Sequence, residues 1–210
     1  MTNLVIKPRR GRPPKVAREN YDTRAELIRS GLEHLTEFGF ASSGIDPILK
    51  KVGVPKGSFY HYFASKEAFG ESVIAHYDRY FSDKLDMHLL NANYSPLMRL
   101  QNFVDDAVQG MTRHDFKRGC LVGNLSQEVD ALPSGFRTQL TAIFVSWQHR
   151  VETCLQEAQL MGEVAHSTDC TQVAEFFWIG WEGAVSRAKL VENAKPLRLF
   201  IQYFLQALPK

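Results

Sequence analysis

The sequence predicts an all-α fold of about nine helices, in which a small three-helix head precedes a larger helical body. Apolar residues recur at intervals of three and four from residue 21 almost to the C-terminus, and no segment alternates apolar and polar residues as a strand does. Of the 210 residues, 44% are hydrophobic and 23% are charged, a composition that supports a sizeable core. We divide the chain into a basic arm (1–20), a head (21–81) and a body (82–210).

Capping residues delimit the first two helices of the head. Thr23 and Glu26 have the spacing of a capping box, and Gly39 is expected to end the first helix in a left-handed conformation. The serine pair at 42–43 is expected to cap a short second helix that ends at Gly53. Its predicted inward face consists of aliphatic side chains (Ile45, Ile48, Leu49 and Val52).

The third helix follows the second after only a few residues. Pro55 suits its first turn, within "PKGSFYHYF". Phe59 and Phe63 are four residues apart, so they share the face that packs inward. Ser65 is expected to cap a long fourth helix over about 66–90. Two helices joined at this spacing predict a helix-turn-helix, whose second helix enters the DNA major groove.

The body is predicted to be helical throughout, with looser boundaries. A turn at "NANYSP" precedes one amphipathic helix, and the glycine of "FKRGC" precedes a shorter one. Pro133 and Ser134 open a long helix that Gly162 closes. An aromatic-rich helix is expected over 169–191, and a last helix follows Pro196.

The distribution of charge indicates an anionic partner for the first third of the chain. Residues 1–66 carry 12 Lys and Arg against 6 Asp and Glu, whereas the remainder carries 13 against 17. In the basic arm, Arg10 and Arg12 belong to "RGRP", an extended strip that can enter the minor groove of A·T-rich DNA. The alternative is a solvated tail that aids solubility.

The third helix has the residues of a DNA-contacting surface. Lys56 and Tyr60 can bond phosphate oxygens, and the small Gly57 allows the helix to approach base edges. His61 lies beside Tyr60, and Lys66, unfavourable in the first turn of its helix, is explained by an external phosphate. The alternative is that "FYHYF" is all core, with satisfied Tyr and His tips.

"GIDPILKKV" followed by "GVPKGSFYHYFASKEAF" resembles the helix-turn-helix of TetR-type transcriptional repressors. The resemblance covers about residues 21–81 and implies a homodimer, with a DNA-binding head and an effector pocket in the body of each subunit. By position it implies operator contacts from Ser43, Lys56, Gly57, Tyr60, His61 and Lys66.

"RGCLVGNLSQEV" and "WIGWEGAVSRAKL" resemble the branch of that family containing the repressors of acrylate utilisation and of N-ethylmaleimide reductase. The resemblance implies small electrophilic or unsaturated effectors, a reactive Cys120 and a lysine linked to it, Lys189. Independently, Lys117, Arg118 and a helix N-terminus are expected to lower the pKa of the Cys120 thiol. The alternative is a small buried packing residue.

Apolar walls with few polar anchors are typical of an effector pocket. The candidates besides Cys120 and Lys189 are Phe103, Asn124, Trp147, Phe177, Trp178 and Trp181, and most of these aromatic residues are expected in the core. The last two helices are apolar on more than one face, and Gly180 and Gly183 allow close approach. These features predict a four-helix interface between two subunits.

Other classes of function are less well supported. Three cysteines with no CxxC indicate neither disulfides nor zinc, so a reducing cytoplasm and no metal or cofactor are expected. No apolar run is long enough to span a bilayer. An enzyme would need a catalytic motif that the sequence lacks. An architectural protein that binds A·T-rich DNA without an effector is the remaining alternative, against which the large hydrophobic body argues.

Overall fold

The computed structural model describes residues 22–210, so the basic arm with Arg10 and Arg12 lies outside the described residues. Over this range the chain is all helical, with nine α-helices, one 3₁₀ helix and no strand. The elements are α1 (Thr23–Phe38), α2 (Asp46–Val52), α3 (Lys56–Phe59), α4 (Lys66–Leu89), α5 (Pro96–Thr112), α6 (Leu121–Gln127), η1 (Val129–Ala131), α7 (Ser134–Leu160), α8 (Cys170–Val191) and α9 (Lys195–Ala207).

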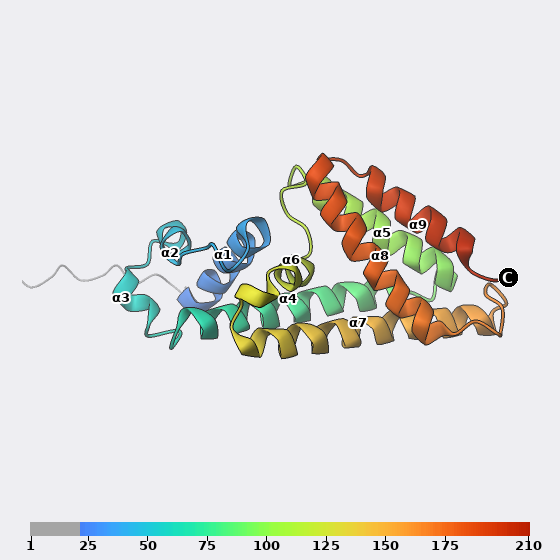
Figure 1. The fold of residues 1–210 in the computed structure, drawn as a ribbon, viewed down its shortest axis with the longest axis horizontal. Coiled ribbons are helices and arrows are strands. Elements are labelled where there is room, and N and C mark those ends of the chain that lie inside the picture. The colour runs from blue at the N-terminus through green and yellow to red at the C-terminus, as the bar shows by residue number, and fades with distance from the viewer. Residues whose placement is uncertain (1–21) are drawn as a thin grey trace, which may run out of the picture.

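The molecule is elongated, with α1–α3 forming a head at one end and α5–α9 forming the body (Figure 1). Helix α4 belongs to both parts, because it starts in the head and continues without a break past residue 81, where we expected the domain boundary. Its 24 residues correspond to a rod about 36 Å long. Ser65 caps it as expected, accepting a hydrogen bond from the Ala68 amide at 3.0 Å.

Three of the expected helix caps were wrong. Gly39 ends α1, but with φ 81° and ψ 178° it does not adopt the left-handed helical conformation. Asp22, rather than Thr23, caps α1, because its carboxylate accepts the amides of Arg24 and Ala25. No serine side chain caps α2, which begins after Ile45 with a proline in its first turn. Gly53 ends α2 in the left-handed conformation as expected, with φ 71°.

Aromatic rings form the centre of the head. Phe59 and Phe63 are buried, as expected, and each ring lies about 5 Å from that of Phe69 on α4. The predicted inward face of α2 is also buried. Helix α3 is shorter than predicted, because after Phe59 the chain continues in turns rather than in a regular helix.

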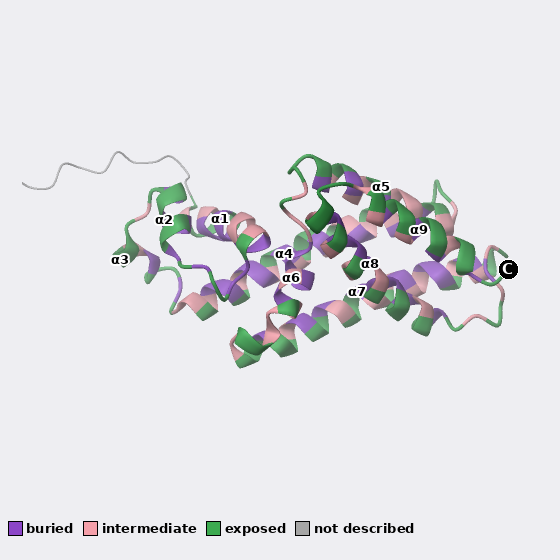
Figure 2. Ribbon diagram, turned by 45° about the horizontal axis from the view of Figure 1, so that its top comes forward, coloured by how far each residue is buried: buried purple, intermediate pink, exposed green. Residues whose placement is uncertain are grey.

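A continuous hydrophobic core joins α4, α5, α7 and α8 in the body (Figure 2). Arg99 is the buried cation of this part, where its guanidinium donates to the carbonyl of Leu89 and to Glu157. No helix among residues 22–210 combines the length and apolarity needed to cross a lipid bilayer.

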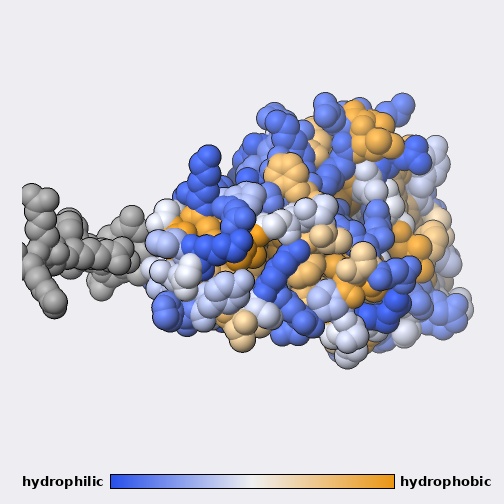
Figure 3. Space-filling view, turned by 60° about the vertical axis from the view of Figure 1, so that its left-hand side comes forward, coloured by the Kyte–Doolittle hydropathy of each residue, from blue (hydrophilic) through white to orange (hydrophobic). Residues whose placement is uncertain are grey.

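Several large apolar side chains of α8 and α9 point away from this core. The exposed fraction is 66% for Ile179 and 59% for Phe176 on α8, and 60% for Tyr203 on α9. Figure 2 shows the exposed side of α9, and Figure 3 shows hydrophobic patches among hydrophilic residues on another face of the molecule. Helices α8 and α9 therefore present apolar surface outward as well as inward.

Candidate DNA-binding surface and effector pocket

The candidate DNA-binding surface lies at the tip of the head, on α3 and the turn after it. Lys56, Gly57, Tyr60 and His61 are all exposed there, and a Cβ on Gly57 would meet no atom within 4 Å. The Lys56 ammonium lies 3.2 Å from the Asp46 carboxylate, and both side chains face solvent. A phosphate can therefore compete for Lys56 at little cost.

Two of the predicted DNA contacts have hydrogen-bond partners inside the head. Ser43 is buried, and its hydroxyl donates to the carbonyl of Gly39 at 2.6 Å. The Lys66 ammonium donates to the carbonyl of Phe40 at 2.9 Å and lies 4.3 Å from the centre of the Phe40 ring. Burial lowers the pKa of Lys66. Its place in the first turn of α4 is thus explained by an internal partner.

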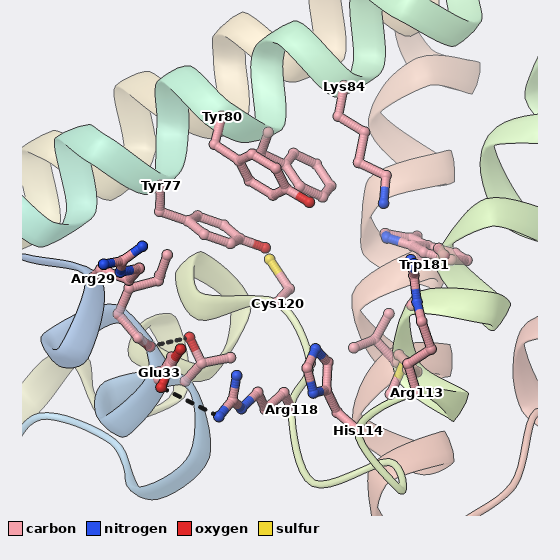
Figure 4. Close-up of a pocket in the computed structure, with 18 residues that line it drawn as sticks. Arg29, Glu33, Tyr77, Tyr80, Lys84, Arg113, His114, Arg118, Cys120 and Trp181 are labelled. Carbon is pink, nitrogen blue, oxygen red and sulfur yellow. Dashed lines mark hydrogen bonds and ion pairs between the residues drawn. The ribbon is translucent and has the colours of Figure 1, made fainter. Parts of the chain in front are cut away.

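A cavity of about 320 Å³ lies at the junction of head and body (Figure 4). Helix α1 supplies one wall, α4 and α5 two others, and the remaining walls are residues 113–120 and α8. The lining residues are Arg29, Leu32, Glu33, Thr36, Tyr77, Tyr80, Phe81, Lys84, Ala107, Gly110, Met111, Arg113, His114, Arg118, Gly119, Cys120, Trp181 and Val185. A molecule bound in this cavity would contact both parts of the chain.

Cations outnumber anions around this cavity. Arg29, Lys84, Arg113 and Arg118 line it, whereas Glu33 is the one carboxylate in the lining. Glu33 forms ion pairs with Lys51 of α2 and, at 3.6 Å, with Arg118, and the hydrogen bond from Lys51 lowers its pKa. Three of the cations are paired with carboxylates, since Arg29 contacts Glu26, Lys84 contacts Asp106 and Arg118 contacts Glu33. A ligand carboxylate or polarised carbonyl oxygen would therefore meet Arg113 directly and would compete with Asp106 for Lys84.

Cys120 lines the cavity and is also the N-cap residue of α6. Its sulfur accepts a hydrogen bond from the Gly123 amide at 3.3 Å, and 5% of the residue is exposed. Burial raises the pKa of the thiol well above its usual value, an effect strengthened by the carboxylate of Glu182. The expectation of a lowered pKa was wrong, because Lys117 points to solvent and the thiol points inward.

Two side chains that were not predicted as site residues flank the thiol: Tyr77 is buried, and Glu182 is partly buried. The Tyr77 hydroxyl lies beside the sulfur (Figure 4), and the Glu182 carboxyl meets it from outside the cavity lining. Burial raises the pKa of Glu182 to about 7. An acid four residues after the buried Trp178, and therefore on nearly the same face of an apolar helix, is the sequence signal that could have identified Glu182.

Helix α6 fastens the body to the end of α1. The Asn124 amide donates to the carbonyl of Thr36 at 2.8 Å, and the Glu128 carboxylate, directly after α6, accepts the amides of Phe40 and Ala41. The Lys189 ammonium also approaches the Thr36 carbonyl, at 3.4 Å, and burial lowers its pKa. Cys120, Asn124 and Glu128 thus belong to one short segment, whereas Lys189 reaches the same carbonyl from α8.

Most of the other predicted pocket residues lie elsewhere. Phe103, Trp147, Phe177 and Trp178 are fully buried in the core; for example, the two tryptophan rings lie 5.1 Å apart. Asn124 and Lys189 bind the α1 backbone, although the Lys189 stem packs on Gly119 beside Cys120. Trp181, together with Cys120, does line the cavity.

Comparison with known families agrees with this architecture. Residues 27–73 match the model for bacterial regulatory proteins of the tetR family, and residues 96–204 match the tetracyclin repressor-like C-terminal domain. The chain belongs to the TetR family of transcriptional repressors. The two matched regions correspond to the helix-turn-helix head and to the helical body, on either side of the middle of α4.

Three TetR-family relatives illustrate the extent of the similarity. The chain is 50% identical to the transcriptional regulator AcuR of Cereibacter sphaeroides over 94% of this chain and 90% of that protein. It is 30% identical to the transcriptional repressor NemR of Escherichia coli K12 over 84% and 89%. The crystal structure of a regulatory protein TetR from Rhodobacter sphaeroides has a TM-score of 0.87 at 49% identity, covering 89% of this chain and 98% of that one. These relatives are transcriptional regulators, and they confirm the branch that the sequence resembles.

Proposed function

We propose that this TetR-type repressor binds its operator as a homodimer and is released when a small α,β-unsaturated carbonyl compound occupies the cavity and reacts with Cys120. The observation that carries the proposal is the position of Cys120. Its sulfur forms part of the cavity wall while it caps the helix that holds α1 to the body. A change at this atom therefore acts on the connection between the effector pocket and the DNA-binding head.

The cavity fits the chemistry of such an effector. Its volume of about 320 Å³ suits a small molecule, and Phe81, Met111 and Trp181 provide apolar walls for the alkene. The carbonyl or carboxylate oxygens would lie against Lys84 and Arg113. A thiol adds to the electron-poor carbon of an alkene activated in this way.

The head binds DNA through the exposed side of α3. Lys56 and Tyr60 contact phosphate oxygens, and Gly57 brings the helix close to base edges. The basic arm follows the neighbouring minor groove. Because many phosphates are contacted, operator affinity falls steeply with salt concentration.

The exposed apolar faces of α8 and α9 form the interface between two subunits. Phe176 and Ile179 of α8 and Tyr203 of α9 are among the large exposed apolar side chains available there. A second copy of α8 and α9 packed on them gives a four-helix interface, which sets the spacing of the two α3 helices.

Signal transmission depends on α6. Modification of Cys120 displaces the sulfur that caps α6. Movement of α6 then disturbs the hydrogen bond of Asn124 to α1 and that of Glu128 to the residues directly after α1. The head then shifts relative to the body, and the two α3 helices no longer match the spacing of adjacent major grooves.

The test is an operator-release assay paired with intact mass measurement. The full chain, bound to a duplex selected from a random library, is treated in parallel with acrylate, methyl acrylate and hypochlorite. Release with one adduct on Cys120 supports the proposal, and Cys120→Ser should lose this response. Cys154→Ser is the control and should keep the response, because Cys154 is a buried cysteine whose thiol donates a hydrogen bond to the Pro96 carbonyl. Release without a change in mass would show that binding alone suffices, and a fully responsive Cys120→Ser chain would contradict covalent sensing.

A further inference from the structure

The thiol of Cys120 is held in its protonated form, which poses a chemical problem for a covalent sensor. The thiolate is the reactive species, and burial disfavours it most, with a further contribution from the Glu182 carboxylate. The Gly123 amide and the Tyr77 hydroxyl act in the opposite direction, but the net effect is a raised pKa of the thiol. The cations of the cavity do not solve this problem, because the Cys120 sulfur meets Tyr77 and Glu182 rather than an arginine or lysine. A base must therefore accept the proton as the sulfur reacts.

We propose that Glu182 is the general base of the sensing reaction and accepts the Cys120 proton while the sulfur adds to the effector. This inference rests on the covalent sensing proposed above and extends it. Cys120 lines the cavity whereas Glu182 does not, so the proposed base does not take up the space in which an effector would bind. Its Oε1 is closed off from solvent and has no hydrogen-bond partner among the described residues.

Gly123 provides the space for this carboxyl. A Cβ on Gly123 would overlap Glu182 Oε2, so any other residue at this position would push the carboxyl away. The amide of the same glycine donates to the Cys120 sulfur at 3.3 Å and stabilises negative charge as it develops there. One residue thus positions the base and supports the nucleophile.

The reaction balances with these groups alone. As the sulfur bonds to the β-carbon of the unsaturated carbonyl compound, the thiol proton passes to Glu182 and the π electron pair moves onto the carbonyl as an enolate. The enolate then receives a proton at its α-carbon through the Tyr77 hydroxyl, and Glu182 returns its proton to Tyr77. The thiol and the alkene become one thioether, and no oxidant is required.

The acid strength of Glu182 suits this role. Burial raises its pKa to about 7, so near neutral pH a large fraction is ionised and able to accept a proton. The titratable groups that face it are Cys120 at the start of α6 and Tyr77 on α4, and burial raises the pKa of both. Lys189, farther along α8, directs its ammonium to the Thr36 carbonyl instead.

The experiment measures the rate of Cys120 alkylation by methyl acrylate from pH 5.5 to 9.5, by intact mass, for the full chain and its variants. The wild-type rate should be half-maximal at about pH 7 and reach a plateau at about pH 8, and Glu182→Gln should lower the rate at pH 7 about a hundredfold. In that variant the rate should instead keep rising into the alkaline range, as the thiolate forms directly. Glu175→Gln, at an exposed position of the same helix, is the matched control and should follow the wild type.

Further measurements separate the possible failures. Gly123→Ala should reproduce the pH profile of Glu182→Gln, and thermal unfolding of each variant checks that it is folded. Equal rates for the wild type and Glu182→Gln over the whole pH range would overturn the role of Glu182 and leave covalent sensing intact. A wild-type chain that gains no mass at Cys120 would overturn covalent sensing, and this inference with it.

Discussion

The carboxylate of Glu128 accepts a hydrogen bond of 2.9 Å from the backbone amide of Ala41, a residue 87 positions away in the sequence. The same oxygen accepts the amide of Phe40 at 3.1 Å. These amides follow the end of α1, so a body residue satisfies donors of the head. The pair is a direct link between the segment that contains Cys120 and the DNA-binding head.

Removal of the Glu128 carboxylate should reduce the effect of the effector on operator affinity more than it reduces operator affinity itself. Glu128→Ala leaves two amides without their acceptor and should cost about 1–3 kcal/mol in the free energy of unfolding. The variant should bind its operator with near wild-type affinity, but the effector-induced change in affinity should shrink severalfold. Titration by fluorescence anisotropy with and without effector measures both quantities. Asp130→Ala, which removes a nearby exposed acid, is the control, and an equal loss of coupling in both variants would refute the role of this link.

Changes at α3 should affect DNA binding and leave the fold intact. The double variant Lys56→Ala/Tyr60→Phe should lose at least about tenfold in operator affinity, because it removes two exposed donors to phosphate. The slope of log affinity against log salt should fall by about 1, since one cation is lost. Lys195→Ala, an exposed cation of α9, should change neither quantity. Unchanged binding by the double variant would place the operator contacts elsewhere.

The contribution of Glu182 to the stability of the protein should decrease as the pH rises through neutrality. The pKa of Glu182 is about 7 in the folded chain and about 4.5 when unfolded, so folding favours the protonated form. Its stabilising contribution is complete below pH 4.5 and is lost as the pH rises to about 7. By linkage the difference is on the order of 3 kcal/mol. Glu182→Gln should therefore have a higher Tm than the wild type at pH 8 and a similar Tm at pH 4.5, and identical melting curves at pH 8 would contradict the raised pKa.

A charge on the outer face of α8 should prevent dimerisation. Ile179→Lys places an ammonium where the two subunits are proposed to meet, and its burial without a partner is unfavourable. Sedimentation velocity should show a monomer, with operator affinity reduced at least about a hundredfold. Val145→Lys introduces the same charge at a similarly exposed position of α7 and should remain dimeric. A dimeric Ile179→Lys chain would move the interface away from this face.

The fold could be predicted from the sequence to a large extent, because the signals that define helices are local. Ser65 and Gly53 act as caps through residues adjacent to them in the chain, and the spacing of Phe59 and Phe63 places both rings inward. The cap of α1 was assigned one residue too late, because Asp22 and Thr23 both suit that position.

The pocket depends on distant residues and was harder to predict. Lys117 and Arg118 precede Cys120 in the sequence, but the environment of its thiol is formed by Tyr77 of α4 and Glu182 of α8. Arg29 and Glu33 belong to the head and still line the cavity. Lys66 resembled a phosphate ligand because its partner, the Phe40 carbonyl, lies 26 residues earlier. Sequence periodicity predicts which face of a helix such residues occupy, but it does not predict which residue of another helix or loop they contact.

The composition of α6 has a consequence for how much effector is needed to trigger the response. The helix spans seven residues, and Gly123, Asn124 and Ser126 are poor helix formers, so it has little stability apart from its neighbours and its cap. The helix–coil equilibrium of α6 then determines the effector concentration at which half of the operator is released. Replacement of the partly exposed Ser126 by alanine, worth a few tenths of a kcal/mol, should shift the curve to higher effector concentration without altering the pocket or the operator contacts. The sensitivity of this repressor is thus adjustable at a residue that touches neither ligand nor DNA.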